Sequence, residues 1–163
     1  MKQKLKQLVL IIFTLVLSCG LYAKGDVPDD CKYKNKDDVL HKIYTSTRYG
    51  SYQDLCQHWI NDPVIALAAV RQDGMALRYA GPFKGDPEVV MAAVRENGRA
   101  LQFADEIVNK GGDDAKEVVM AAVREDGMAL QYADQFKEDR EVVMVAVWED
   151  GMALQFADQF KED

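Results

Sequence analysis

The chain has 163 residues, of which 48% are hydrophobic and 29% are charged, and its formal net charge is −7. An acidic balance of this size argues against binding of nucleic acid or of an anionic membrane surface through charge. We therefore expect no nucleic-acid partner.

The first 23 residues are basic and then apolar. Three lysines and no acidic residue precede an apolar run over Leu8–Leu17, which only Thr14 interrupts. The run has the length of a signal-peptide core and is shorter than the roughly 18–20 apolar residues of a membrane span. We therefore expect residues 1–23 to be a signal peptide and the protein to be exported to a bacterial periplasm, a cell surface or the extracellular space.

Two cleavage sites fit this leader. Ala23 ends a small-residue site of the type Leu-Tyr-Ala. Alternatively, Val-Leu-Ser-Cys resembles a lipobox, in which the leader ends at Ser18 and Cys19 carries a lipid as the first mature residue. A third possibility is that Cys19 is only a small residue of the discarded peptide. A lipid on Cys19 is the one expected contact with a membrane.

Residues 24–37 are polar without a helical period, and we expect an irregular N-terminal arm. If the leader ends at Ala23, Cys31 and Cys56 are the remaining cysteines, and an exported chain with one pair favours a disulfide between them. The alternative is that Cys56 fills a small buried position that alanine fills elsewhere in the chain.

Both histidines, His41 and His58, lie in the same region as Cys31 and Cys56. A Cys/His metal site is the alternative use of these residues, but neither a CxxC nor an HxxxH spacing is present. We predict that no metal or cofactor is bound and that both histidines lie on the surfaces of helices.

From residue 38 onward the chain repeats with a period of 24 residues. The fourth copy, KEVVMAAVREDGMALQYADQFKED from Lys116, is followed at once by REVVMVAVWEDGMALQFADQFKED from Arg140. Fixed periods in this range indicate stacked supersecondary units. The domain 38–163 divides into five: a degenerate first unit 38–61, a second 62–85, a third 86–114, a fourth 115–138 and a fifth 139–163.

Each unit has two apolar segments around a glycine. Val118–Val123 is apolar on every side, and its alanine and methionine favour a helix that neighbouring units must cover. Asp-Pro opens two of the units and marks a helix start. Met128–Phe136 has the pattern of an amphipathic helix, and we interpret Gly127 between the segments as a left-handed helix C-cap. The prediction is an all-α fold of helical hairpins stacked as a short α-solenoid.

Two units depart from this pattern. Residues 38–61 align with the second unit after a shift of 24, which places Asp38 on Asp62 and Ile43 on Leu67 with polar residues at several apolar positions. An end unit with a polar outer face is what a repeat array needs. The third unit is five residues longer than the others, and we expect a flexible loop at Asn109–Asp114.

The fifth unit ends on an apolar face without degeneration. It has Val145 and Trp148 where other copies have alanine and arginine, and Phe160 stays apolar. We expect this face to contact a second copy or another protein. Arginines at the end of three first helices also predict a charged edge, which we interpret as a solvated rim in preference to a partner ridge: Arg71, Arg95 and Arg124.

The run VVMAAVREDGMALQYADQFKEDREVV resembles the DUF4116 family of short helical repeats, typified by VVLAAV…G.ALQYAS…..D.EVV, over about Asp62–Asp163. The family name records an unknown function, so the resemblance implies a helical repeat fold and no catalytic residue. No nucleophile elbow, phosphate-binding glycine loop or suitable carboxylate pair is recognisable in the sequence.

We therefore predict an exported, non-catalytic protein-binding or scaffold module. One alternative is a small metal-dependent or enzymatic module around Cys31, His41, Cys56 and His58. Another is a fragment of a longer array, since Asp163 stands where a sixth unit would begin.

Overall fold

The computed structural model describes residues 31–45, 55 and 57–160, so the leader lies outside the described residues. Within these ranges every regular element is helical and no strand occurs. The α-helices are α2 (Lys36–Thr45), α4 (Gln57–Ile60), α5 (Pro63–Gln72), α6 (Pro87–Glu96), α7 (Asp105–Lys110), α8 (Gly112–Glu125) and α9 (Arg140–Glu149). The 3₁₀ helices are η1 (Gly74–Tyr79), η2 (Gly81–Gly85), η3 (Gly98–Phe103), η4 (Gly127–Tyr132), η5 (Asp134–Phe136), η6 (Gly151–Phe156) and η7 (Asp158–Phe160). The all-α class predicted from the sequence is confirmed.

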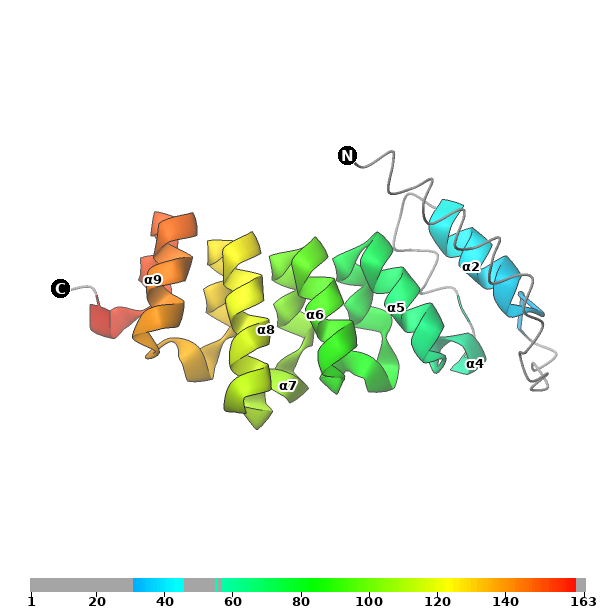
Figure 1. The fold of residues 1–163 in the computed structure, drawn as a ribbon, viewed down its shortest axis with the longest axis horizontal. Coiled ribbons are helices and arrows are strands. Elements are labelled where there is room, and N and C mark those ends of the chain that lie inside the picture. The colour runs from blue at the N-terminus through cyan, green and yellow to red at the C-terminus, as the bar shows by residue number, and fades with distance from the viewer. Residues whose placement is uncertain (1–30, 46–54, 56, 161–163) are drawn as a thin grey trace.

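Units two to five pack in chain order, each contacting the next. Helices α5, α6, α8 and α9 lie side by side in a row (Figure 1). The 3₁₀ helices η1, η3, η4 and η6 follow the same order in a second layer, each contacting its neighbour. The core lies between the layers, where aliphatic side chains such as Val94, Leu101, Val123 and Leu130 are fully buried. Neighbouring units therefore cover the first helices, which have little polar surface of their own.

Aspartates start the first helix in three units. Asp62 Oδ1 accepts hydrogen bonds from the backbone N–H groups of Val64 at 2.9 Å and Ile65 at 3.2 Å, and Pro63 occupies the first helical position. Asp86 and Asp139 cap α6 and α9 in the same way. The helix starts predicted from Asp-Pro are confirmed because this signal depends only on neighbouring residues.

The second segment of units two to five forms 3₁₀ helix. Asp126 is extended, with φ −148° and ψ 106°, which ends α8, and its carboxylate accepts a hydrogen bond from the N–H of Met128 to start η4. Ala133, with φ −111° and ψ 53°, then leaves the helical region, so Phe136 belongs to a separate turn, η5. The predicted single α-helix over Met128–Phe136 is therefore wrong. A cap before the segment and a bend after it confine the chain to a run of six residues, which is long for 3₁₀ helix.

The glycine at the start of η1, η3 and η4 serves close approach. The described glycines with positive φ are Gly81, Gly111 and Gly112, so the predicted left-handed cap at Gly127 is wrong. A Cβ on Gly127 would lie 2.3 Å from the carbonyl oxygen of Ala146, in the first helix of the next unit. A Cβ on Gly74 would lie 2.3 Å from the carbonyl oxygen of Ala93, and a Cβ on Gly98 would lie 2.4 Å from that of Ala122. Any side chain here would push adjacent units apart.

The first unit joins the row through α2, which packs on α5. Its N-cap is Asn35, whose side-chain oxygen accepts a hydrogen bond from the N–H of Asp38 at 2.8 Å. Alignment of Asn35 with Asp62 requires a shift of 27, in place of the predicted 24, and this pairs buried Val39 with buried Ala66. The helix therefore begins within the predicted arm. The other face of α2 is mostly polar, with Tyr44 as an exposed aromatic residue. A terminal unit needs such a polar outer face.

The additional residues of the third unit extend helices. The predicted flexible loop at Asn109–Asp114 is wrong, because α7 runs to Lys110 and α8 begins at Gly112. Gly111 has φ 67° and Gly112 has φ 84°, and this left-handed pair turns the chain within a very short connection. The added residues give α8 a length of 14 residues, compared with 10 in α6 and α9.

Gly127→Ala and Gly151→Ala form a matched pair, since both glycines stand in the sequence Glu-Asp-Gly-Met-Ala-Leu. The methyl group added at Gly127 collides with the Ala146 carbonyl oxygen, so we expect a loss of about 1–3 kcal/mol in the free energy of unfolding. Around Gly151 a Cβ meets nothing within 4 Å, so we expect a change within about 0.5 kcal/mol. Urea unfolding followed by circular dichroism measures both, and equal losses would contradict the close-approach explanation.

Candidate functional site

The fifth unit presents an open hollow at the end of the row. Its volume is about 520 Å³, and it is lined by Arg140, Val143, Met144, Val147 and Trp148 of α9 and by Phe160 of η7. The α9 residues follow the spacing i, i+3, i+4, i+7 and i+8, which places them on one face of the helix. Leu154 of η6 completes the lining. We call this surface the C-terminal face.

The C-terminal face repeats a surface that is covered in the fourth unit. Met144 is 63% exposed, whereas Met120, its counterpart in α8, is 8% exposed beneath α9. Leu130 of η4 is buried, and its counterpart Leu154 is only half-buried. The difference arises from stacking: α9 and η6 cover the fourth unit, and no described element covers the fifth in the same way.

The sequence identified part of this face. Trp148 is 87% exposed and lines the hollow together with half-buried Phe160. Val145 does not line the hollow but packs against the core. Met144 and Val147 were not singled out because they match their counterparts in other copies, whereas Val145 and Trp148 were chosen on α9 as departures from the repeat. The helical spacing from Arg140 would have found them.

An ion pair crosses the junction between the fourth and fifth units. Lys116 Nζ lies 2.9 Å from Asp139 Oδ2, on the residue that caps α9, and 2.9 Å from Glu141 Oε2. Hydrogen bonds to Asp139 and Glu141 raise the pKa of Lys116, and the hydrogen bond from Lys116 lowers the pKa of Asp139. Lys36, at the first position of α2, reaches the α5 cap Asp62 in the same way, at 2.7 Å.

Lys36 and Lys116 hold the same position in the repeat, and a cation at this position can therefore pair with the cap of the next first helix. Arg140 occupies the first position of α9 and lines the hollow. Arg140 therefore holds, on the C-terminal face, the repeat position that Lys116 holds on the surface that α9 covers.

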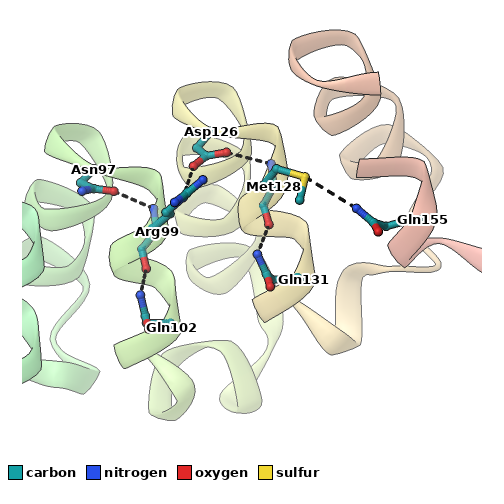
Figure 2. Close-up of polar contacts among 7 residues, drawn as sticks. All are labelled: Asn97, Arg99, Gln102, Asp126, Met128, Gln131 and Gln155. Atoms are coloured by element: carbon teal, nitrogen blue, oxygen red, sulfur yellow. Dashed lines mark hydrogen bonds and ion pairs between the residues drawn. The ribbon is translucent and has the colours of Figure 1, made fainter. Parts of the chain in front are cut away.

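A second set of polar contacts joins the 3₁₀ helices (Figure 2). Arg99 Nε donates to Asp126 Oδ2 at 2.8 Å, which links η3 to the cap of η4. The Gln131 amide donates to the Met128 carbonyl oxygen within η4, and the Gln155 amide approaches the Met128 sulfur from η6 at 4.0 Å. The arginines of the predicted charged edge lie exposed at the ends of α5, α6 and α8: Arg71, Arg95 and Arg124. The described ion pairs between units use Arg99, Lys36 and Lys116 instead.

The Cys/His region is only partly described. Cys31 is buried, His41 is exposed on α2, and His58 packs edge-on against Trp59 with ring centroids 4.6 Å apart. Among the described residues, no group of three or more histidine, cysteine or acidic side chains is placed to hold a metal ion. Cys19 and Cys56 lie outside the described residues, so the disulfide and the lipid attachment stay predictions.

No helix in the described part of the chain is long and apolar enough to cross a membrane. The elements described above define an all-α protein built of short helical units. A protein-family model described as "Domain of unknown function (DUF4116)" matches residues 58–108 and again residues 116–162, and each match spans two units. The matches cover more than half of the chain, and the protein belongs to the DUF4116 family. Comparisons with curated proteins and with solved structures found no match.

Lys116→Met removes the cation from the junction between units four and five. The lowered pKa of Asp139 means that its contribution is present above the ordinary value of 3.8 and is lost as pH falls through the lower folded value. The raised pKa of Lys116 means that its contribution is present below 10.5 and is lost as pH rises through the higher folded value. We therefore expect the variant to melt below the wild type between these limits, and the difference to shrink as the pH falls below 3.8.

Melting temperatures at pH 2 and pH 7, each at low and high salt, measure this difference, which salt should also reduce. Lys110→Met, at an exposed lysine of α7, is the matched control and should show no such dependence. A difference in melting temperature that is as large at pH 2 as at pH 7 would mean that lost side-chain packing, and not the ion pair, causes the effect.

Proposed function

We propose that the protein is an exported, non-catalytic repeat protein that binds another protein through its C-terminal face. The observation that carries the proposal is the gathering of exposed apolar side chains on the fifth unit. Met144, Trp148 and Met152 are three of the five large hydrophobic residues exposed in the described part of the chain. Contiguous apolar surface on a soluble protein marks an interaction site more often than scattered residues do.

The composition of the face supports a protein partner. Tryptophan, methionine and arginine are enriched in protein interfaces, and tryptophan and arginine carry a large share of their binding energy. Trp148 and Arg140 both line the hollow, beside the aliphatic Val143 and Val147. The open, mostly aliphatic lining offers no nucleophile or paired carboxylates for chemistry. Contact with a macromolecular surface suits it better than enclosure of a small substrate.

Export is supported by the leader. Its basic start and short apolar run fit a signal peptide, and a disulfide between Cys31 and Cys56 would suit the oxidising compartments outside the cytoplasm. Attachment to a membrane through a lipid on Cys19 belongs to the same proposal as its alternative form. The metal-dependent or enzymatic alternative gains no support from the described contacts, since His58 packs on Trp59.

The binding proposal is tested with Trp148→Arg, the residue found at this position in the second, third and fourth units. Because Trp148 is 87% exposed, we expect the variant to fold as the wild type does and to lose at least 1 kcal/mol of binding, or about fivefold in affinity or more. Tyr44→Arg, at an exposed aromatic residue on α2, is the control. Parallel capture from the native cell envelope and light scattering of the pure proteins are the measurements. Equal binding by all three proteins would remove the C-terminal face from the proposal.

The export proposal is tested by the mass of the protein purified from its native host. We expect either a chain that begins at Lys24 or a lipid-bearing chain that begins at Cys19. Alkylation without prior reduction should leave Cys31 and Cys56 unmodified, and alkylation after reduction should modify both. A full-length chain that begins at Met1, with freely alkylated cysteines, would contradict export.

A further inference from the structure

The chain itself indicates what fits the C-terminal face, because the same kind of surface is filled at each internal junction. We propose that this face binds a further repeat unit of the DUF4116 type, carried by a partner protein. The inference rests on the proposed binding function and specifies the chemistry of the partner: a first helix with an acidic N-cap, an acid at its second position and an apolar side.

The shape of the face supports a repeat unit. At the three junctions from the second unit to the fifth, a glycine leaves room for a backbone carbonyl oxygen of the next unit, as Gly127 does for Ala146. Gly151 holds the same position in the fifth unit, and a Cβ built on it would meet nothing within 4 Å. Nothing described in this chain requires the absence of a side chain there. A stacked unit would require it, because its own helix would bring a carbonyl oxygen to that point.

The apolar part of the face has its counterpart beneath α9. Met120, Val119 and Val123 of the fourth unit are buried by stacking, and their counterparts Met144, Val143 and Val147 line the hollow. An arriving unit of the same kind would bring the aliphatic side chains that α9 brings to α8. The exposed part of the face would then be covered as its counterpart already is.

The charge at the rim selects the acidic partner. Lys116 is paired with the N-cap carboxylate Asp139 and with Glu141, the second residue of α9. Arg140 holds the repeat position of Lys116 and lines the hollow of the C-terminal face. A partner helix that begins Asp-x-Glu therefore places two carboxylates near Arg140, which a guanidinium binds well.

A second copy of this chain does not offer that surface at its other end. The terminal helix α2 has buried Val39 and Ile43 against α5, and its free side carries exposed Asp37, Asp38 and Lys42. Head-to-tail stacking of two copies would therefore place charged side chains on the apolar hollow, at a desolvation penalty. A tail-to-tail dimer is the remaining arrangement of two copies, and the experiment distinguishes it.

The test appends a copy of Lys116–Asp139 directly after Asp163 of the full chain. Asp163 aligns with Asp139, so it supplies the N-cap of the added helix, and fusion makes the local concentration high enough for docking. The readout is peroxide oxidation of individual methionines followed by mass spectrometry. Stacking of the added unit should slow oxidation of Met144 by about eightfold, the ratio of the exposed fractions of Met144 (63%) and Met120 (8%).

Gly151→Ala is the matched control. In the chain without the added unit it should change neither melting nor methionine oxidation, since its Cβ has open space. In the extended chain it should restore the fast oxidation of Met144, because the methyl group would block the arriving carbonyl oxygen. Arg140→Glu should weaken the protection of Met144 in the extended chain alone, through repulsion of Asp163 and the added glutamate.

Two results would overturn the inference. Met144 in the extended chain could oxidise as fast as in the natural chain, which would show that the face does not accept a repeat unit. The natural chain could also form a dimer in light scattering that Met144→Lys dissociates, which would show that a second copy covers the face.

Capture from the native envelope separates this inference from the proposed function. A partner that neither the Trp148→Arg variant nor the Gly151→Ala variant captures should itself contain DUF4116 units with an Asp-x-Glu helix start. A captured protein could instead lack such units and lose its binding only to the Trp148→Arg variant. This result would contradict the inference and would still support the proposed binding function.

Discussion

The approach of one backbone to the next at glycine is the constraint on which the packing depends. Gly74, Gly98 and Gly127 each lie where a single added carbon would meet a carbonyl oxygen at 2.3 or 2.4 Å. The contact fixes how closely adjacent units approach, and it explains why the core beside it uses alanine, valine and leucine in repeating positions. Wider spacing would open voids between the layers, which a close-packed interior does not tolerate without loss of stability.

The 3₁₀ helix explains how so short a repeat can form two layers. Six residues at about 2.0 Å each span roughly 12 Å, and the ten residues of an α-helix at about 1.5 Å each span roughly 15 Å. The two elements of a unit are therefore similar in length although one has far fewer residues. Aspartate or asparagine serves both, because one residue ends the α-helix through its backbone and starts the 3₁₀ helix through its side chain.

The sequence predicted what neighbouring residues determine and failed where the answer depends on another unit. The Asp62 and Asp86 caps were predictable, since a carboxylate and a following proline act within one turn. The role of Gly127 was not, because a left-handed cap and a close approach both require glycine. The backbone angle of Gly127 and the position of Ala146 decide between them. Trp148 was found as a departure from the repeat. Met144 was missed because only the absence of a covering helix distinguishes it from Met120.

The two ends of the described row are not equivalent. Helix α2 closes one end with polar side chains, and α9 leaves an apolar surface at the other. The row of helices is therefore polar in direction, because only its α9 end presents an apolar surface on which a further unit could pack. In the proposed stacking, units would be added at the α9 end alone, and each added unit of the same kind would expose a new apolar surface like the one that it covered. Such addition would end at a unit whose outward-facing helix is hydrophilic, as α2 is.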